Sequence, residues 1–292
     1  MTARRLTAYV RLLALVAAIG IASTTTQAWG KQGHRLVAMI AANHLTVTAR
    51  ENVAWLLGHA SLADVASWAD EYLEGNIQTS AWHYVNIPPF ATAYDRDRDC
   101  PTQPGVSAGG RGDTWRDCVI DRILYNEQRL ANPTLDRADR AIALKFLVHL
   151  VGDLHQPFHA LGVERGGNGI PVIAFGSGDC SSGAATPRPC NLHGVWDVSL
   201  IARRRLGDLQ YLTTLQQQIK HRQWDREPIG TPADWAIQSH ALAKIALVPA
   251  YGKIDDAYYA EHIRVVDERL ALGGLRLAAM LNRSFTTPPP RQ

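Results

Sequence analysis

The stretch from His149 to His159 constrains this chain more than any other part of its sequence. It closes a long apolar segment, which we interpret as a helix over residues 136–156. His149 and Asp153 are four residues apart, so they lie one turn above each other on the same helix face. Pro157 cannot continue the helix, which lets His159 approach from another direction. Two imidazoles and a carboxylate against an apolar surface favour a divalent-metal site over a solvated helix end.

Other histidines and carboxylates recur along the chain. His193 and Asp197 repeat the four-residue spacing at the start of a predicted helix, whereas His155 points away from the face of Asp153. Five histidines lack a carboxylate partner at such spacing, and we interpret them as surface or core residues: His44, His59, His221, His240 and His262. The candidate metal ligands have nitrogen and oxygen donors of the kind zinc accepts, and they are His34, Asp70, His83, His149, Asp153, His159, His193 and Asp197. Such pairs in one cleft would build a multinuclear centre that makes hydroxide at neutral pH and binds a phosphate.

Residues 1–28 have the pattern of a secretory signal peptide. Arg4 and Arg5 precede an apolar run, and a small-residue cleavage site ends at Ala28. The apolar run is shorter than the ~20 residues that a membrane-spanning helix needs, which favours cleavage over a membrane anchor. We therefore expect a mature protein that begins at Trp29, is secreted or periplasmic, and has no membrane attachment.

Charge excludes one way of binding nucleic acid. The chain has 30 Lys and Arg against 27 Asp and Glu, and three of the arginines lie in the signal segment. The mature protein is therefore near neutral and has no net basic field to attract a polyanion. If the protein acts on phosphate, bound metal must supply the local positive charge.

The four cysteines of an exported chain predict two disulfides. The sequence allows three pairings, and proximity favours Cys100–Cys118 and Cys180–Cys190, each of which closes a local loop. A cysteine-containing zinc site is disfavoured, because the close cysteine pairs of such sites are missing.

The mature chain predicts an all-α fold in a single domain over residues 29–285, with small β-hairpin pieces in loops, one of them a strand at 171–175. Helices are expected near residues 61–73, 115–130, 209–221, 232–247 and 255–281. The polar, glycine-rich connection 90–114 is longer than an ordinary loop, so we expect it to be functional or tied down. The proline-rich tail, 286–292, is expected to be disordered.

At these residues the sequence resembles the zinc-dependent nuclease family that contains fungal nuclease P-one, fungal nuclease S-one and the plant bifunctional nucleases. The resemblance spans nearly the whole mature chain, and the motifs that carry it are Trp29 with Gly33-His34, Trp68-Ala-Asp70, Trp82-His83-Tyr84, the stretch from His149 to His159, Gly167-Asn168, and His193 with Asp197. The zinc phospholipase C family shares the fold and much of the ligand set, and is the alternative. Its last ligand is typically Glu, whereas this chain has Asp197, which favours the nuclease.

The resemblance implies three zinc ions per chain. The implied ligand sets are Asp70, His83, His149 and Asp153 for one ion, His159, His193 and Asp197 for another, and the amine and carbonyl oxygen of Trp29 with His34 and a bridging Asp153 for the third. Asp70 would also orient the attacking water and is therefore the expected catalytic residue. The ions bring more positive charge than the three carboxylates return, so a neutral protein can still bind phosphate.

The implied activity is that of an endonuclease on single-stranded DNA and RNA, with 5′-phosphorylated products and a further 3′-nucleotidase activity. Single strands are favoured because the base at the cleaved bond must be splayed out and stacked. Tyr84 is the candidate stacking platform, and Asn86 and Asn168 are candidate base or phosphate donors. The chain departs from the fungal enzymes at Asn86, where they have a base-selecting Asp, and at Leu73, where they have a phosphate-assisting Arg. We expect a monomer.

Overall fold

The computed structural model describes residues 29–290 except 101–114, 182–185 and 228. The predicted signal peptide, residues 1–28, lies outside the described residues, as does most of the predicted long loop. The α-helices are α1 (Lys31–Asn43), α2 (Val47–Leu57), α3 (Trp68–Gly75), α4 (Arg96–Asp99), α5 (Val119–Ala131), α6 (Arg137–His155), α7 (Leu192–Gly194), α8 (Leu200–Arg203), α9 (Asp208–Arg222), α10 (Pro232–Ile245) and α11 (Asp256–Ser284). Shorter 3-10 or π-helical turns are η1 (Ile77–His83), η2 (Pro157–Ala160), η3 (Val195–Ser199) and η4 (Trp224–Arg226). The predicted all-α class is confirmed.

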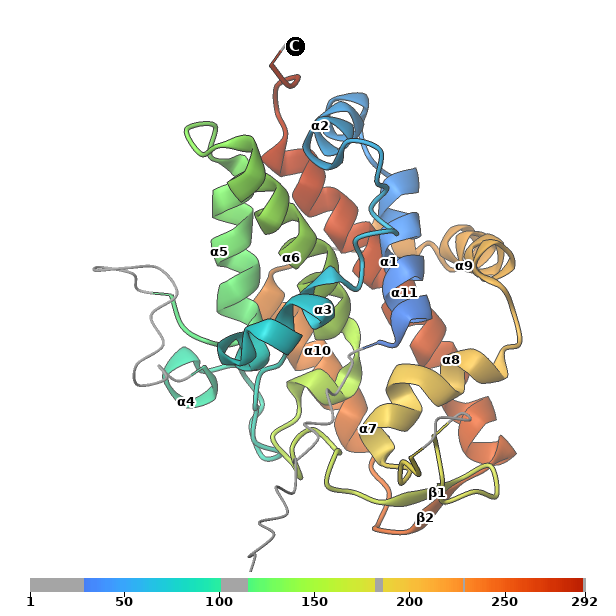
Figure 1. The fold of residues 1–292 in the computed structure, drawn as a ribbon. Helices are drawn as coiled ribbons and strands as arrows, with labels where there is room; N and C mark the ends of the chain where they lie inside the picture. The colour runs from blue at the N-terminus through green and yellow to red at the C-terminus, as the bar shows by residue number, and fades with distance from the viewer. Residues whose placement is uncertain (1–28, 101–114, 182–185, 228, 291–292) are drawn as a thin grey trace, which may run out of the picture.

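Helix α6 lies at the centre of the bundle, where it packs against α5, α11, α1 and α10 (Figure 1). Asp136 caps its first turn by accepting a hydrogen bond from the Asp139 amide. The helix ends at His155, two residues before Pro157, as expected from a proline that cannot continue a helix. Every residue from 146 to 155 is buried. A helix that is buried all round must find partners for its polar side chains inside the protein.

Two helices begin later than predicted. Helix α3 begins at Trp68 rather than near Ser61, because the Asp64 carboxylate accepts hydrogen bonds from the amide and hydroxyl of Ser61. Such local bonds stabilise a turn in competition with the helix. Helix α5 begins at Val119 rather than at Trp115, directly after an extended cysteine that is held in a disulfide.

The predicted strand exists, but its predicted hairpin pairing is wrong. Strand β1 (Val172–Ala174) pairs in parallel with β2 (Gly252–Ile254), which lies far along the chain. Next to β1 the chain makes only isolated antiparallel bridges among the described residues, such as Ala174 with Ser177. Parallel pairing requires a long connection, and the helices from α7 to α10 supply it. A local pattern can therefore predict a strand without predicting its partner.

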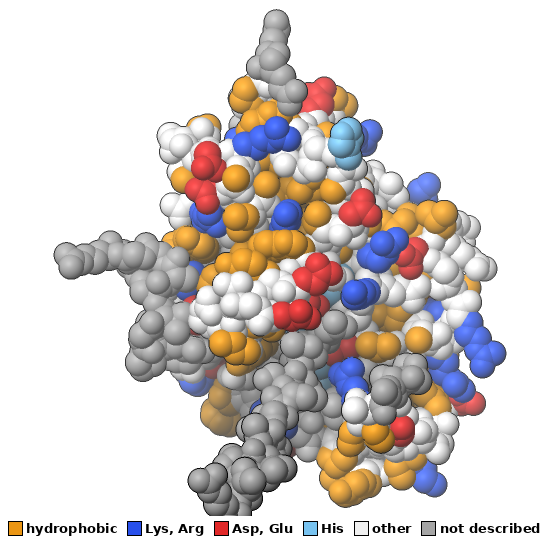
Figure 2. Space-filling view, in the orientation of Figure 1, with side chains coloured by type: hydrophobic (Ala, Val, Ile, Leu, Met, Phe, Trp, Pro, Cys, Tyr) orange, Lys and Arg blue, Asp and Glu red, His pale blue; other side chains and the backbone are white. Residues whose placement is uncertain are grey.

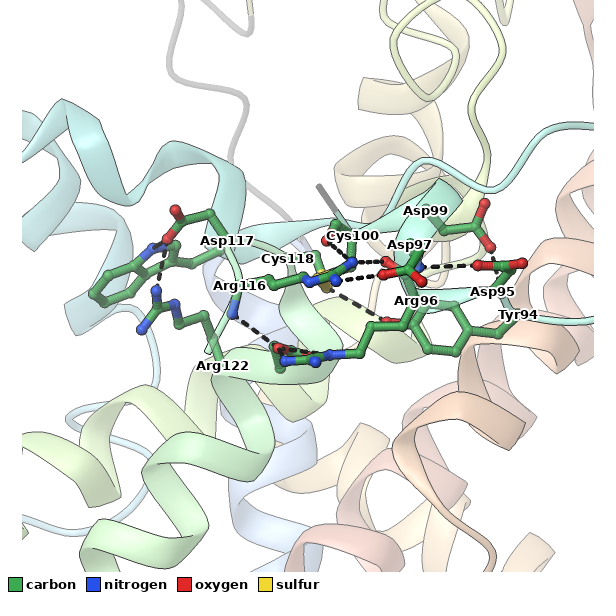
Figure 3. Close-up of a disulfide and its surroundings, with 12 residues drawn as sticks. Tyr94, Asp95, Arg96, Asp97, Asp99, Cys100, Arg116, Asp117, Cys118 and Arg122 are labelled. Carbon is green, nitrogen blue, oxygen red and sulfur yellow. Dashed lines mark hydrogen bonds and ion pairs between the residues drawn. A yellow bond between two sulfur atoms is a disulfide. The ribbon is translucent and has the colours of Figure 1, made fainter. Parts of the chain in front are cut away.

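Both predicted disulfides are present. Cys100 pairs with Cys118 and Cys180 with Cys190, at Cα–Cα distances of 5.3 and 4.9 Å. Around the first bond, shown in Figure 3, the Arg96 guanidinium pairs with the Asp121 carboxylate at 2.5 Å. The disulfide and this ion pair fasten the start of α5 to α4.

The predicted tail is described as far as Pro290. The backbone oxygen of Thr287 accepts a hydrogen bond from the Asn52 amide of α2 at 2.8 Å. Disorder of the whole tail stays a prediction, because its last two residues lie beyond the described part. No helix within the described residues is long and apolar enough to span a membrane.

Candidate metal centre

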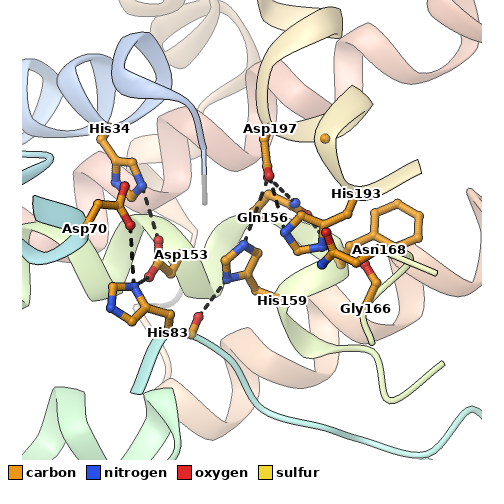
Figure 4. Close-up of polar contacts among 12 residues, drawn as sticks. His34, Asp70, His83, Asp153, Gln156, His159, Gly166, Asn168, His193 and Asp197 are labelled. Carbon is orange, nitrogen blue, oxygen red and sulfur yellow. Dashed lines mark hydrogen bonds and ion pairs between the residues drawn. The ribbon is translucent and has the colours of Figure 1, made fainter. Parts of the chain in front are cut away.

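The eight predicted histidine and aspartate ligands converge on one end of α6 (Figure 4). They come from seven elements: His34 from α1, Asp70 from α3, His83 from η1, His149 and Asp153 from α6, His159 from η2, His193 from α7 and Asp197 from η3. None of these residues is more than 7% exposed. Eight ionisable side chains are thus buried together, which requires that their charges be compensated inside the protein.

The first cluster is formed by His34, Asp70, His83, His149 and Asp153. The two carboxylate oxygens of Asp153 face different partners, since Oδ1 lies 3.2 Å from His34 Nε2, whereas Oδ2 lies 2.9 Å from His83 Nδ1 and 3.3 Å from His149 Nε2. The Asp70 carboxylate lies 3.3 Å from His149 Nε2. Asp153 therefore has one oxygen beside His34 and the other beside His83 and His149, and each oxygen could help to hold a cation.

The second cluster is formed by His159, His193 and Asp197. His193 Nε2 lies 3.3 Å from Asp197 Oδ2, and His159 Nε2 lies 4.0 Å from Asp197 Oδ1. The Gln156 amide donates a hydrogen bond to Asp197 Oδ1 at 2.5 Å. The carboxylate is thus fixed on one side while its other oxygen faces the imidazole of His193.

The orientation of three imidazoles fits a metal ligand. His149, His159 and His193 each have Nδ1 at 2.6 to 2.8 Å from a backbone carbonyl oxygen, those of Ala66, His83 and Gly166 respectively. A proton on Nδ1 leaves the Nε2 lone pair directed into the cluster, as in metal-binding histidines. The Nε2 atoms of His159 and His193 are buried and have no hydrogen-bond partner among the described residues. Buried unpaired acceptors beside a carboxylate are suited to a cation.

The spacing of the donor atoms also suits metal ions. Donor atoms lie within 4.8 Å of one another in three groups that contain cluster residues: His34, His149 and Asp153; Asp70, His83 and His149; and His159, His193 and Asp197. The last group is the set expected for one ion. His149 belongs to both of the other groups, whereas the resemblance placed it with only one ion. A further group, Cys100 with Cys118 and Asp121, has its sulfurs in a disulfide and therefore no thiolate ligands.

Burial and charge set the protonation of these groups. Burial lowers the pKa of His34 to about 4 and that of His193 to about 3, so both imidazoles are neutral at pH 7. Burial also acts to lower the pKa of His149, but Asp153 and Asp70 outweigh it and raise that pKa well above its usual value. Burial raises the pKa of Asp197 well above its usual value. A bound cation would take the place of the protons that His149 and Asp197 otherwise retain.

Trp29 is fully buried, and the Gly30 amide next to it donates to the backbone oxygen of Asp197 at 2.8 Å. The predicted start of the mature chain is thus attached to the element that carries the second cluster. The Trp29 nitrogen joins a residue outside the described part, so its role as a ligand stays a prediction.

A pocket of about 330 Å³ lies beside the clusters. The metal-cluster histidines that line it are His83, His159 and His193, and its other walls include the three predicted substrate-binding residues, Tyr84, Asn86 and Asn168. Leu73 lines the same pocket, as does Arg165. The substrate-binding residues predicted from separate motifs therefore line one pocket together with the cluster histidines.

Several residues of the site are not apparent in the sequence. Gln156 carries no charge, and its bond to Asp197 depends on how η2 and η3 meet. Gly152 lets the His34 ring lie against α6, because a Cβ at this position would stand 2.7 Å from His34 Nδ1. His155, as predicted, belongs to neither cluster.

Residues 29–286 of the chain match the S1/P1 Nuclease family. Nuclease P1 of Penicillium citrinum is 30% identical over 285 residues, which cover 87% of this chain and 97% of the relative. Nuclease S1 of Aspergillus oryzae is 30% identical over 310 residues, covering 95% and 99%. Endonuclease 4 of Arabidopsis thaliana is 32% identical over 296 residues, covering 89% and 90%. The similarity extends over most of each chain and is not confined to the metal-binding motifs.

Proposed function

The chain belongs to the S1/P1 nuclease family, and we propose that it is a zinc-dependent endonuclease that hydrolyses single-stranded DNA and RNA to 5′-phosphorylated products and 3′-nucleotides to nucleosides. The observation that carries this proposal is the pair of buried His and Asp clusters beside a pocket lined by Tyr84 and three asparagines, Asn86, Asn168 and Asn191. Cation-binding clusters suit a phosphate, and an aromatic and amide pocket suits a base.

We assign three zinc ions to the clusters, with the ligand sets that the resemblance implies. The donors are neutral imidazoles and carboxylates, which zinc accepts. Bound zinc would neutralise charge on the phosphate and make water a better nucleophile at neutral pH. Acidic and basic side chains are interspersed on the face of the molecule drawn in Figure 2, which supports recognition through the centre instead of a broad basic surface.

Asp70 is the residue proposed to orient the attacking water. Burial acts to raise its pKa, but the neighbouring His149 outweighs burial and lowers it. Asp70 is therefore a carboxylate at neutral pH and can accept a hydrogen bond from water or take up its proton. Its Oδ1 lies 3.3 Å from His149 Nε2, at the edge of the first cluster.

Tyr84 is proposed to stack on the base next to the cleaved bond. Its side chain is half-buried and lines the pocket beside His83. Asn86 is exposed in the same pocket, and the Asn168 amide donates to the Arg165 carbonyl at 3.0 Å, which orients that side chain. A base reaches such a pocket only when it leaves the stack, so single strands are expected to be better substrates than duplexes.

Signal-peptide cleavage before Trp29, secretion or periplasmic location, and a monomeric state complete the proposal. The two disulfides support an oxidising compartment.

Metal analysis and a substrate panel test this function together. Purified protein is expected to contain zinc, to cleave single-stranded DNA, RNA and 3′-AMP, and to lose these activities reversibly with a chelator. Release of choline phosphate from a phosphatidylcholine analogue without cleavage of nucleic acid would instead establish the phospholipase alternative. Zinc-loaded protein that is inactive on every substrate would contradict the enzymatic proposal.

A further inference from the structure

A second pocket, of about 320 Å³, adjoins the pocket beside the metal clusters. The two pockets share Arg165, Asn168 and Asn191 in their lining, and we call the two together the groove. The second pocket is lined by Arg188 and by no aromatic residue. It therefore lacks a surface on which a base could stack.

The groove is positively charged. Its lining includes Arg165 and Arg188 but no aspartate or glutamate among the described residues. Both arginines are exposed, and neither belongs to a salt bridge within the described part of the chain. By contrast, Arg122 pairs with the Asp117 carboxylate at 2.8 Å. Two guanidinium groups without acidic partners along a groove are available for an anionic ligand.

Arg165 is attached to the metal centre through its backbone. Four consecutive residues from Glu164 have positive φ angles, of 45°, 56°, 63° and 79°. At Gly166 a Cβ would stand 2.5 Å from the Phe158 carbonyl oxygen, so only glycine fits. The Gly166 carbonyl lies 2.6 Å from His193 Nδ1 (Figure 4). The same turn thus orients a cluster histidine and places Arg165 at the groove.

Arg188 is positioned by the Cys180–Cys190 loop. Its amide donates to the Asp179 carboxylate at 3.1 Å, and its carbonyl accepts from the Cys180 amide at 2.7 Å. At Gly194 a Cβ would stand 3.9 Å from Arg188 Nη2, so the guanidinium lies close to the residue that follows His193 of the second cluster.

We propose that Arg165 and Arg188 form a subsite for a second phosphate, the one next to the cleaved phosphodiester along a single strand. This inference rests on the proposed nuclease function and adds to it a preference for longer strands. A planar guanidinium binds two phosphate oxygens at once, and the absence of stacking surface at Arg188 favours a phosphate over a base. Leu73 lines the pocket at the position where the fungal enzymes have a phosphate-assisting arginine, and it carries no charge. Arg165 lines the same pocket and supplies a positive charge there.

The test compares substrates that differ in the number of phosphates. The dinucleotide TpT has a single phosphodiester, whereas a strand of ten thymidines has phosphates on both sides of most bonds. In Arg188→Gln, kcat/KM for the ten-residue strand is expected to fall roughly tenfold, the loss typical of one charge-assisted hydrogen bond, while kcat/KM for TpT stays unchanged. The slope of log KM against log salt for the long strand should also decrease by about 0.7. Arg165 lines both pockets, so Arg165→Gln is expected to weaken both substrates, the longer one more.

Arg264→Gln is the matched control, because Arg264 is exposed on α11 and lines neither pocket. Equal activity of Arg188→Gln and wild type on the long strand would overturn the subsite, as would an equal loss in the Arg264→Gln control. If wild-type protein cleaves neither substrate, the nuclease proposal fails separately. Fluorescence anisotropy with a phosphorothioate strand of ten thymidines then decides the subsite, since Arg188→Gln must still bind it more weakly.

Discussion

The last turns of α6 have buried polar side chains on two faces. The two groups differ in the kind of partner that each buried polar side chain has. On one face, His149 and Asp153 belong to the metal clusters, where buried carboxylates face imidazoles with unpaired nitrogens. On the other face, His155 meets two buried arginines of α11, Arg269 and Arg276, with no carboxylate in the contact. We call the second group the arginine cluster.

Neutral groups accept the hydrogen bonds that the two arginines of this cluster donate. Arg276 donates to His155 Nε2 at 2.9 Å and to the Gln238 side-chain oxygen at 2.8 Å. Arg269 donates to the same Gln238 oxygen at 3.1 Å and to the His155 carbonyl at 3.3 Å. His155 Nδ1 lies 2.7 Å from the Val151 carbonyl. Burial lowers the pKa of Arg269 to about 9 and that of Arg276 to about 10, and lowers the pKa of His155 well below its usual value.

The comparison distinguishes a ligand histidine from a structural one. His155 has a partner for each ring nitrogen, whereas His159 and His193 pair Nδ1 with a carbonyl and leave Nε2 unpaired. Within the described residues, the metal clusters thus keep several buried imidazole nitrogens without partners, whereas in the arginine cluster Arg276 Nε alone is left without one. Changes in the first region should alter zinc content and activity, and changes in the second should alter stability.

The largest expected effect is that of Asp70→Asn on activity. We expect at least the ~10²-fold loss of kcat that follows removal of an acid or base group, with zinc content and the melting temperature nearly unchanged. Asp225→Asn makes the same chemical change at an exposed position and should remain fully active. Near wild-type turnover in zinc-replete Asp70→Asn would show that another residue activates the water.

An altered amino terminus should have the next largest effect. A neutral α-amine is a good zinc ligand, with a reference pKa of ~7.7–8, whereas a peptide nitrogen is a poor one. Protein that begins with one extra Ala before Trp29 is therefore expected to bind about one zinc fewer and to lose most of its activity. An extra Ala at the carboxyl terminus is the control. Equal zinc content and turnover in all forms would rule out the amine as a ligand.

Gln156→Met should weaken zinc binding at the second cluster. Because the Gln156 amide orients Asp197, we expect the affinity of one zinc ion to fall roughly 10- to 100-fold in competition with a chelator. Gln238→Met is the matched change in the arginine cluster, and it should leave zinc affinity as in wild type. If both variants lose zinc equally, the two regions are coupled and the distinction between them is wrong.

The smallest effect on activity is expected from Arg276→Met. This change leaves the buried His155 Nε2 without a donor, which costs about 1–3 kcal/mol in the free energy of unfolding, while the Gln238 oxygen keeps its hydrogen bond from Arg269. Chemical denaturation of the zinc-loaded protein measures the loss, and zinc content should not change. Arg264→Gln, on the exposed side of the same helix, should stay within about 0.5 kcal/mol of wild type. A loss of activity in Arg276→Met at full zinc content would contradict the claim that changes in the arginine cluster alter only stability.

Local spacing in the sequence predicted the parts of the site that lie within one continuous helical stretch, either α6 or the run from α7 into η3. His149 with Asp153 and His193 with Asp197 are four residues apart, and helix geometry alone brings them together. The two disulfides were also predictable, because each closes a short loop. His34, Asp70, His83 and His159 were predicted from their ligand chemistry and carry no such spacing, and the fold brings them to the same end of α6.

Only the tertiary structure decided the contacts between distant elements. The partner of β1, the bond from Gln156 to Asp197, and the groove between Arg165 and Arg188 join residues that no local pattern relates. The same holds for the partners of His149 and His155, because helix spacing put the two side chains on different faces but did not predict what they would contact. Packing places His149 beside carboxylates and another imidazole, and His155 beside arginines, because the neighbours of a buried imidazole are supplied by other parts of the fold.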